Sequence, residues 1–228
     1  MIAKIVCKLE PITLVGGAAV ESQQLERAIV EAPTLVAADG GAAHIMHAGK
    51  VPDAVIGDMD SLSGNLKAIL PKTVIHQIEE QDSTDFEKCL LRIESPLIVG
   101  LGFLGGRLDH QLAAFHGLMQ FADQRCVLLG SQEVVFLCPP KLDLNLSAGT
   151  PVSLFPLGPV NAQASGLKWS FNSLDFAPGE KIGTSNVADG AISLKTNAPA
   201  LLCILPAECF ETVVKALVAQ PGSWPARG

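Results

Sequence analysis

Two aspartates, Asp58 and Asp60, stand one residue apart directly after the short apolar run 54–56. In an extended segment, residues i and i+2 project from the same side, so the two carboxylates can be directed at one point. At about 5 Å and an effective dielectric of about 20, two such charges repel by roughly 3 kcal/mol, and a bound divalent cation would turn this repulsion into attraction. The alternative is a polar turn that caps a helix over 62–70 and needs no cation.

Further acidic residues and glycines follow the predicted strands of the first half of the chain. Up to about residue 130, short β-branched runs alternate with helical periodicity, which is typical of βαβ units on a parallel sheet. Ligands of such sheets bind beyond the carboxyl ends of the strands. Solvated acids would also be spread along helix faces, so this clustering favours cation binding over capping. The residues are Asp39, Asp58, Asp60, Asp82 and Asp85, with glycines at 16–17, 40–41 and 100–106.

The elements that must position these residues can be predicted from the same periodicity. Strands are expected at 12–15, 34–38, 55–56, 73–78, 96–99 and 126–129. Helices are expected at 20–30, 42–48, 62–70, 85–93 and 108–121, and Ser83 or Thr84 is a suitable N-cap for the fourth. These elements predict an N-terminal Rossmann-like α/β domain over 1–131 with a parallel sheet.

Beyond residue 130 the pattern changes to short alternating segments separated by Gly, Pro, Asn and Ser. The spacing is typical of a β-sandwich, so a second, all-β domain is predicted over 132–228. A terminal helix is expected over 208–218, although Val213 and Val214 are β-branched. The expected strands are 133–138, 142–146, 151–155, 160–164, 190–194 and 200–205.

The loop 100–106 matches G-x-G-x-x-G between a strand and a helix, but the next strand, 126–129, ends in Gly-Ser instead of the acidic residue that would hold a ribose. An ordinary glycine-rich turn is one alternative. We favour glycines that let backbone N–H groups approach a phosphate, with Arg107 as a bidentate donor and Asp109 and His110 opening the helix. A Walker loop and a nucleophile elbow are both absent from the sequence, which favours phosphoryl-group chemistry by positioning and charge neutralisation.

Composition excludes several other classes of protein. The net charge of −7 and the pI of about 5.2, without any basic run, argue against nucleic-acid binding. The N-terminal residues offer no signal-peptide core and no apolar run is long enough for a membrane span, so we expect a cytoplasmic protein. The six cysteines form no C-x-x-C pair and lie mostly in apolar runs, which indicates reduced core residues.

Six sequence blocks resemble the thiamine pyrophosphokinase family, whose members transfer a pyrophosphoryl group from ATP to the hydroxyl of thiamine and release AMP. The blocks occur in the family's order and span most of the chain, from Gly16 to about Leu205. They are Ala-Asp-Gly-Gly at 38–41, Gly-Asp-Met-Asp-Ser at 57–61, Gln-Asp-Ser-Thr-Asp-Phe-Glu-Lys at 81–88, Gly-Gly-Arg-Leu-Asp-His at 105–110, Gly-Leu-Lys-Trp at 166–169 and Gly-Thr-Ser-Asn at 183–186.

The resemblance implies a nucleotide-binding catalytic domain over 1–131 that uses Mg²⁺, with ATP as co-substrate. The implied magnesium ligands are Asp58, Asp60 and Asp85. One of Asp60, Asp82 or Asp109 would accept the proton of the thiamine hydroxyl. Arg107 would lie at the ATP phosphates. The other residues implied around the magnesium and the nucleotide are Asp39, Gly40, Gly41, Gln81, Asp82, Thr84, Lys88, Gly105, Gly106, Asp109 and His110.

The resemblance also implies a thiamine-binding β-sandwich over 132–228 and a homodimer with active sites shared between subunits. Trp169 would stack on thiamine from the partner subunit, with Ser185 and Asn186 lining that pocket; an ordinary core position is the alternative for Trp169. Stacking suits a cationic thiazolium or an electron-poor pyrimidine.

Two features depart from the family pattern. Met59 stands where the family usually has Phe, and the segment after Leu205 is longer than the pattern needs, so that Trp224 is expected to serve packing or to lie in a disordered tail. Two alternative functions are considered, and the intact acidic set argues against the second, because a binding-only protein has little need for three convergent carboxylates. One is pyrophosphoryl transfer to another hydroxymethyl heterocycle, such as a pterin, and the other is a non-catalytic nucleotide or thiamine sensor.

Overall fold

The computed structural model describes residues 2–220 and 222–226, and the chain divides into two compact units. The first contains the chain up to Gly117 together with Leu128–Ser131. The second contains Leu118–Val127 and the chain from Gln132 onward. The sequence predicts one crossing, after residue 131, whereas the chain also passes between the units after residues 117 and 127.

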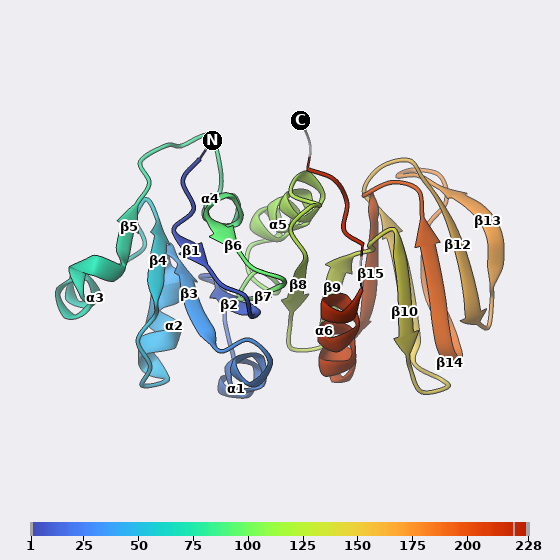
Figure 1. Ribbon diagram of the computed structural model, residues 1–228, viewed down its shortest axis with the longest axis horizontal. Helices are drawn as coiled ribbons and strands as arrows, with labels where there is room; N and C mark the ends of the chain where they lie inside the picture. The colour runs from blue at the N-terminus through green and yellow to red at the C-terminus, as the bar shows by residue number, and fades with distance from the viewer. Residues whose placement is uncertain (1, 221, 227–228) are drawn as a thin grey trace. The chain divides into compact units, whose positions relative to one another are not determined.

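The first unit is built on a parallel sheet. Its paired strands are β2 (Ile12–Val15), β3 (Thr34–Ala38), β4 (Ala54–Gly57), β5 (Ile75–Gln77) and β7 (Ile98–Leu101). β2 pairs with β3 on one side and with β7 on the other, and β3 continues through β4 to β5 (Figure 1). Every residue of β2, β3, β4 and β7 is buried, which explains why these strands read as continuous apolar runs. β8 (Cys126–Leu129) follows β7 in the strand order.

The helices predicted in the first half of the chain are all present, with ends shifted by a few residues. α4 begins after Thr84, whose hydroxyl accepts a hydrogen bond from the backbone N–H of Glu87. Of the two predicted N-caps, Ser83 and Thr84, the helix therefore uses Thr84. The helices are α1 (Ser22–Glu31), α2 (Ala42–His47), α3 (Gly64–Ile69), α4 (Asp85–Arg92) and α5 (Leu108–Gln120).

Several short elements differ from the sequence prediction. The expected strand over 73–78 is shortened, because η2 (Lys72–Val74) forms a 3₁₀ turn before β5. β1 (Val6–Cys7) and β6 (Ile93–Glu94) form a separate parallel pair that the sequence did not predict. Two residues are too few to show a strand periodicity, so only the fold reveals this pairing.

The second unit is antiparallel throughout the pairings of its described residues. It consists of β9 (Glu133–Leu137), β10 (Lys141–Asn145), β11 (Pro151–Pro156), β12 (Val160–Leu167), β13 (Phe171–Phe176), β14 (Gly183–Thr196), β15 (Leu201–Pro206), η3 (Ala207–Cys209) and α6 (Phe210–Ala219). The chain therefore has a mixed α/β fold, with parallel pairing in one unit and antiparallel pairing in the other.

β14 is much longer than the strand predicted over 190–194. Its beginning pairs with β11, up to Val187, and the stretch from Ala188 to Thr196 pairs with β12. β10 pairs with the same later stretch. One continuous strand thus joins two groups of strands, where separate short strands were expected. β13 was missed because most of its residues are exposed or half-buried, so it lacks a clear apolar face.

Two further expectations concern cysteines and membrane spans. All six cysteines are free thiols, and Cys89, Cys126, Cys138 and Cys203 are buried, in agreement with the predicted reduced core residues. Within residues 2–220 and 222–226, none of the helices combines the length and the apolar character that a membrane crossing requires.

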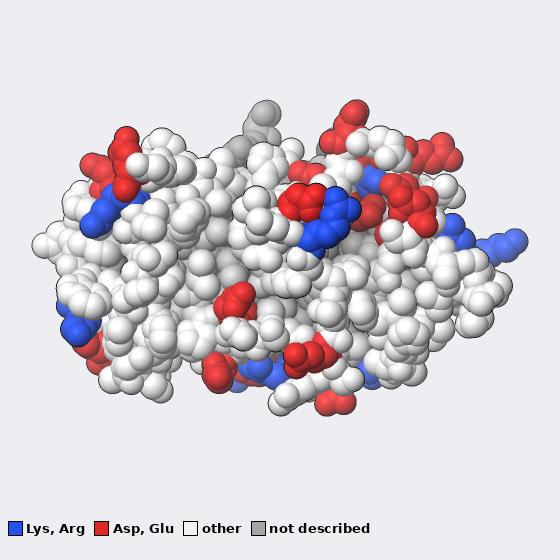
Figure 2. Space-filling view, turned by 180° about the vertical axis from the view of Figure 1, so that it is seen from behind, with Lys and Arg blue, Asp and Glu red and all other residues white. Residues whose placement is uncertain are grey.

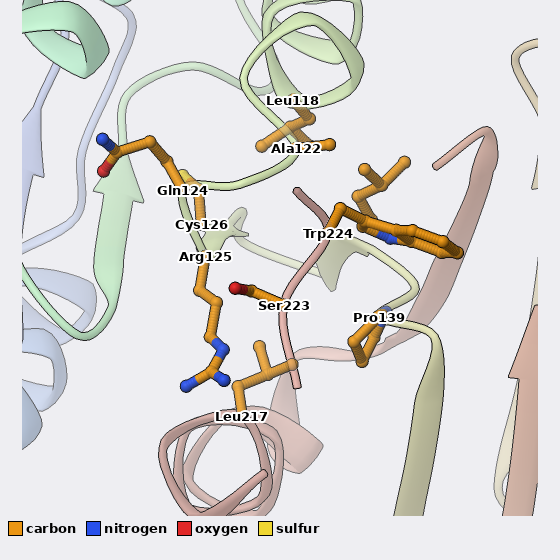
Figure 3. A pocket seen from close by; sticks show the side chains of 10 residues that line it. Leu118, Ala122, Gln124, Arg125, Cys126, Pro139, Leu217, Ser223 and Trp224 are labelled. Atoms are coloured by element: carbon orange, nitrogen blue, oxygen red, sulfur yellow. The ribbon is translucent and has the colours of Figure 1, made fainter. Parts of the chain in front are cut away.

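Trp224 packs against the second unit (Figure 3). Its indole Nε1 donates a 2.9 Å hydrogen bond to the carbonyl of buried Cys138, and Arg125 Nη2 donates a 2.7 Å bond to the carbonyl of Gln220. Pro139 and Leu217 lie beside it around a cavity of about 20 Å³, which suits a single water molecule. This arrangement agrees with the expected packing role of Trp224 and offers no space for a substrate.

We expect Trp224→Ala to lower the free energy of unfolding by about 2 kcal/mol, because a half-buried ring and its hydrogen bond are lost. Urea denaturation followed by circular dichroism measures the change. Trp169→Ala is the matched control, since the Trp169 residue is 57% exposed, and it should stay within about 0.5 kcal/mol of the parent. Equal losses in both variants would contradict the packing role.

Candidate active site

A cavity of about 640 Å³ opens in the first unit beyond the carboxyl ends of its parallel strands. Gly16 follows β2, Asp39 follows β3, Asp58 follows β4 and Gly102 follows β7, and all four line the cavity. The loop before α4 and the beginning of α5 complete the wall. The remaining lining residues are Gly17, Ala18, Ala38, Gly40, Ser61, Gln81, Ser83, Thr84, Asp85, Phe86, Lys88, Phe103, Gly106, Arg107, His110 and Ala114.

The Asp58 and Asp60 carboxylates are brought together by a turn, whereas the sequence argument assumed an extended segment. Met59 between them has a φ of 69° and is 3% exposed, so its side chain is packed inside and its backbone is left-handed. Asp58 Oδ1 accepts a 3.2 Å hydrogen bond from the Asp60 N–H. Lys67 Nζ donates to the Met59 carbonyl at 2.5 Å, which fixes this turn.

Asp39 is the most deeply buried carboxylate of the site, at 2% exposure. Its Oδ2 accepts a 3.0 Å hydrogen bond from the backbone N–H of Ser61, while its buried Oδ1 has no hydrogen-bond partner. The pKa of Asp39 is raised to about 6, first by burial and then by the nearby carboxylates Asp60 and Asp85, although the Ser61 N–H lowers it. A side chain at Gly57 would meet the Asp39 Cβ at 2.8 Å, so only glycine leaves room for this carboxylate.

Three carboxylates can face one point here. Asp39, Asp58 and Asp60 each offer an oxygen, and the three oxygens lie within 4.8 Å of one another. A hard divalent cation such as Mg²⁺ prefers oxygen ligands of this kind, and the unpartnered Asp39 Oδ1 is a buried acceptor that such an ion would satisfy. The chemistry of the donor set therefore fits a magnesium ion.

Lys88 lies between two of the predicted site acids. It is 2% exposed, and its Nζ is 3.2 Å from Asp58 Oδ2 and 3.2 Å from Asp85 Oδ1. Burial would lower the pKa of Lys88, but the two carboxylates together raise it above its ordinary value. The pKa of Asp58 is lowered, first by the Asp60 N–H and then by Lys88, whereas burial raises the pKa of Asp85 despite Lys88.

The loop between β5 and α4 is held by its own side chains. Thr84 and Glu87 form a capping box, in which Glu87 Oε2 accepts from the Thr84 N–H at 2.7 Å. Glu80 accepts hydrogen bonds from the backbone N–H of Asp82 and from the Ser83 hydroxyl. Asp82 is exposed and is not among the residues that line the cavity, while its neighbour Gln81 is.

Acidic side chains also gather outside the cavity. Figure 2 shows them close together at the upper right of the face displayed, over the segment from β5 to α4, while wide areas of the same face carry no charge. This segment carries the exposed residues Glu79, Glu80 and Asp82. Such a concentration of negative charge attracts cations and would repel a bare polyanion.

Arg107 and Asp109 form an exposed bidentate ion pair at the start of α5. Arg107 Nη2 donates to Asp109 Oδ2 at 2.6 Å and Arg107 Nε donates to Oδ1 at 3.1 Å, and this pairing lowers the pKa of Asp109. Asp109 Oδ1 also accepts from the backbone N–H of His110 at 2.9 Å. Because the Arg107 side chain is 71% exposed, it can turn toward an anion in the cavity that it lines.

The glycines of the loop 100–106 serve the close approach of two loops. A side chain at Gly102 would meet the Gly16 carbonyl at 2.6 Å, and one at Gly106 would meet the Ala18 Cβ at 2.8 Å. The Ala18 N–H donates to the Gly102 carbonyl at 3.0 Å. Gly105 has a φ of 76°, which favours glycine, and open space around it. Gly41 is required for packing under the site, because a Cβ there would lie 1.9 Å from the Val15 carbonyl.

The residues predicted for thiamine lie in the second unit, and two of them are joined by hydrogen bonds. The Trp169 N–H donates to Asn186 Oδ1 at 3.2 Å, and Asn186 Nδ2 donates to the Trp169 carbonyl at 3.0 Å. Trp169 is 57% exposed, and Lys168 Nζ lies 4.8 Å from its ring centroid. An ordinary core position, the alternative for Trp169, is therefore wrong. Ser185, which precedes Asn186 in β14, has a φ of 67°.

Sequence reasoning missed two local partnerships in this site. Lys88 was expected near the phosphates, without any indication that it bridges Asp58 and Asp85. The spacing of Asp85 and Lys88, three residues apart on a helix, could have indicated the second contact but not the first. The capping role of Glu87 could also have been predicted, because Thr84 and Glu87 match the capping-box pattern.

The raised pKa of Asp39 predicts a specific dependence of stability on pH. Between its unfolded value near 3.8 and its folded value of about 6, the folded protein binds more protons, so Asp39 reduces stability as pH rises through this window. Two pKa units correspond to about 3 kcal/mol. We expect wild type to lose stability relative to Asp39→Asn by roughly this amount between pH 4 and pH 6.5, measured by urea denaturation in EDTA. Parallel stability curves for the two proteins would contradict this assignment.

Family models match both parts of the chain. The model described as thiamin pyrophosphokinase, catalytic domain, matches residues 25–129, and the model described as thiamin pyrophosphokinase, vitamin B1 binding domain, matches residues 140–201. Thiamine pyrophosphokinase 1 of Oryza sativa subsp. japonica is 32% identical over 157 residues, which cover 60% of this chain and 60% of the rice protein. Thiamin pyrophosphokinase 1 of Caenorhabditis elegans is 29% identical over 87% of this chain and 89% of the relative. The chain thus spans about 60% of the length of the rice protein it matches.

Solved structures share the fold. Thiamin pyrophosphokinase from Geobacillus thermodenitrificans has a TM-score of 0.74 at 22% identity, with 86% of this chain and 97% of that chain covered. The enzyme named thiamin pyrophosphokinase from Candida albicans has a TM-score of 0.75 at 15% identity, with 90% and 93% covered. The two family models together match well over half of the 228 residues, in the order catalytic domain and then vitamin B1 binding domain. The chain therefore belongs to the thiamin pyrophosphokinase family.

Proposed function

We propose that this protein transfers the pyrophosphoryl group of Mg-ATP to the hydroxyl of thiamine, giving thiamine diphosphate and AMP. The observation that carries the proposal is the convergence of Asp39, Asp58 and Asp60 at a strand-end cavity, which Asp39 and Asp58 line, in the part that matches the catalytic family model. Three carboxylates facing one point, of which Asp39 is buried, Asp58 half-buried and Asp60 exposed, are of little use without a cation, and a cation is what phosphate chemistry requires.

The magnesium ligands that we propose are Asp58, Asp60 and Asp85. All three offer carboxylate oxygens, and Asp39 adds a buried oxygen beside Asp58 and Asp60. Magnesium, when bound, would neutralise negative charge on the phosphate oxygens and so favour attack on phosphorus. The exposed acids of the β5–α4 loop, with Gln81 and Asp82, would lie beside the metal.

The nucleotide side of the proposed site consists of glycine backbones and one arginine. Gly40, Gly41, Gly105 and Gly106 leave backbone close to the cavity or under it, and the exposed guanidinium of Arg107 is suited to bidentate contact with phosphate oxygens. Contact with a phosphate would require Arg107 to exchange its bond to Asp109, which would then be free to accept a proton. Thr84 and His110, which line the cavity, complete this side of the proposal.

The proposed reaction is an in-line displacement at the β-phosphorus of ATP. A bond forms between the thiamine hydroxyl oxygen and the β-phosphorus, the bond from that phosphorus to the α–β bridging oxygen breaks, and AMP leaves with the bridging oxygen. The hydroxyl proton passes to one of Asp60, Asp82 or Asp109. The ion pair with Arg107 lowers the pKa of Asp109, which makes this carboxylate a weaker base while the pair persists.

For the thiamine end we propose Trp169, Ser185 and Asn186, in the part matched by the vitamin B1 binding model. The exposed indole suits stacking on a cationic or electron-poor ring, and Asn186 fixes its backbone from both sides. A Rossmann-like domain followed by a β-sandwich, a cytoplasmic homodimer and active sites shared between subunits belong to the same proposal. Transfer to another heterocycle and a non-catalytic sensor are less favoured, because both halves of the chain match models of this one family.

Removing either acid that contacts Lys88 should abolish turnover. We expect Asp58→Asn and Asp85→Asn each to lower kcat by at least about a hundredfold, because the charge that holds the cation is reduced. Formation of AMP and thiamine diphosphate from ATP, magnesium and thiamine is measured by chromatography. Asp143→Asn, which removes a half-exposed partner of Lys141 in the second unit, is the matched control and should retain normal activity. Near-normal activity of both site variants would refute the metal assignment.

Loss of the Trp169 ring should affect thiamine and leave ATP binding unchanged. Stacking on an indole contributes about 1–2 kcal/mol, so we expect Trp169→Ala to raise the KM for thiamine about tenfold, and Trp169→Phe to raise it less. The KM for ATP serves as the internal control in both variants. An unchanged KM for thiamine, or an equal rise for both substrates, would argue against stacking.

A further inference from the structure

We propose that Lys88 is a built-in counter-ion, a positioning residue that holds Asp58 and Asp85 together while the site contains no metal and weakens the attraction of the site for a metal. This inference rests on the proposed cation site. It assigns Lys88 a role through two carboxylates, in place of the contact with ATP phosphates that the family resemblance implies.

The position of Lys88 argues for contact with the carboxylates. Its side chain is 3% exposed, and the ammonium is 3.2 Å from an oxygen of each aspartate, whose side chains are 17% and 33% exposed. A lysine that binds ATP phosphates would present its ammonium to the open cavity. Here the ammonium is held within 3.2 Å of both acids, and the Lys88 side chain, although it lines the cavity, is only 3% exposed.

Lys88 also connects two elements that are distant in the sequence. Asp58 follows β4, whereas Asp85 and Lys88 belong to the first turn of α4. The Lys88 N–H donates to the Thr84 carbonyl at 2.8 Å, and its own carbonyl accepts from Arg92 Nη1 at 3.1 Å, so the backbone from which the side chain extends is fixed. The ammonium therefore sets the separation between the end of β4 and the start of α4.

The charges of the site show what Lys88 does there. Asp39, Asp58 and Asp85 line the cavity, and Asp60 offers an oxygen within 4.8 Å of oxygens of Asp39 and Asp58. The Lys88 ammonium contacts two of these four carboxylates, Asp58 and Asp85. Arg107 is engaged with Asp109, and Lys67 donates to the Met59 carbonyl. A buried ion pair contributes little net stability, so fold stability alone does not explain a buried lysine at this position. Partial neutralisation of the carboxylate charges in the cation-free site does explain why a lysine is buried here.

The counter-ion role predicts that loss of the Lys88 charge has opposite effects in the cation-free and the cation-bound site. Without a cation, loss of the ammonium leaves Asp58 and Asp85 to repel each other, and the protein becomes less stable. With a cation, the missing positive charge no longer opposes binding. At about 5 Å even a well-screened unit charge changes the affinity for a divalent ion by about tenfold.

The test compares wild type with Lys88→Met and Lys88→Arg by thermal denaturation in EDTA and in a magnesium titration, and by Mn²⁺ binding followed by electron paramagnetic resonance. We expect Lys88→Met to have a lower Tm in EDTA, a larger rise of Tm on adding magnesium, and Mn²⁺ affinity at least about tenfold tighter than wild type. Lys88→Arg retains the charge and should respond to cations as wild type does. Lys141→Met, from an exposed ion pair of the second unit, is the matched control and should match wild type.

A lower Tm of Lys88→Met with an unchanged magnesium increment and unchanged Mn²⁺ affinity would overturn the proposal, because a merely structural salt bridge behaves in that way. If Lys88→Met does not fold, Asp85→Asn is compared with Asp85→Asn/Lys88→Met. The double variant should bind Mn²⁺ about tenfold more tightly, and equal affinities would overturn the proposal. Absence of cation binding in every variant would overturn the counter-ion role of Lys88 together with the metal site. Mn²⁺ binding as expected, without AMP formation, would support the counter-ion role and refute only the proposed reaction.

Discussion

The repulsion among carboxylates placed at the ends of adjacent parallel strands is the constraint on which the rest of this site depends. Asp39 follows β3 and Asp58 follows β4, and these two strands are neighbours in the sheet. The two carboxylates are therefore placed close together. The pKa of Asp39 is raised first by its burial and then by the carboxylates Asp60 and Asp85. The local structure offsets it with backbone N–H donors from Asp60 and Ser61 and with the ammonium of Lys88. One buried oxygen, Asp39 Oδ1, is left without a partner, and it is the clearest sign that a further ligand completes the site.

The backbone geometry of these loops also brings the acids together. Asp39 and Met59 both have positive φ values, 42° and 69°, which are unfavourable for residues with side chains. Gly57 and Gly41 remove the side chains that would otherwise collide with Asp39 and with the Val15 carbonyl. Strained backbone, close approach and concentrated charge therefore occur within one loop cluster. Each of these features reduces stability alone, and a bound cation would compensate for the last of them.

Much of the first unit could be predicted from the sequence, because a buried parallel strand is a continuous apolar run and its following loop is marked by Gly and Asp. The strands at 12–15, 34–38 and 126–129 were predicted with their observed bounds for this reason. The pair β1 and β6 and most of β14 could not be predicted, since they are too short or too exposed to carry an apolar period. In the site, the positions of the acids followed from strand order, but the turn at Met59 and the bridge made by Lys88 depend on tertiary contacts that no local pattern contains. The sequence also predicts a single domain boundary at residue 131. No local pattern indicates that Leu118–Val127 groups with the second unit.

In the proposed reaction, the β- and γ-phosphates of ATP move together to thiamine. Incubation with thiamine, magnesium and ATP carrying ³²P at either the β or the γ position, followed by separation of the products, tests it most directly. We expect both labels to appear in thiamine diphosphate and the AMP formed to be unlabelled. Label from the γ position in a monophosphate product, with the β label retained in ADP, would contradict it.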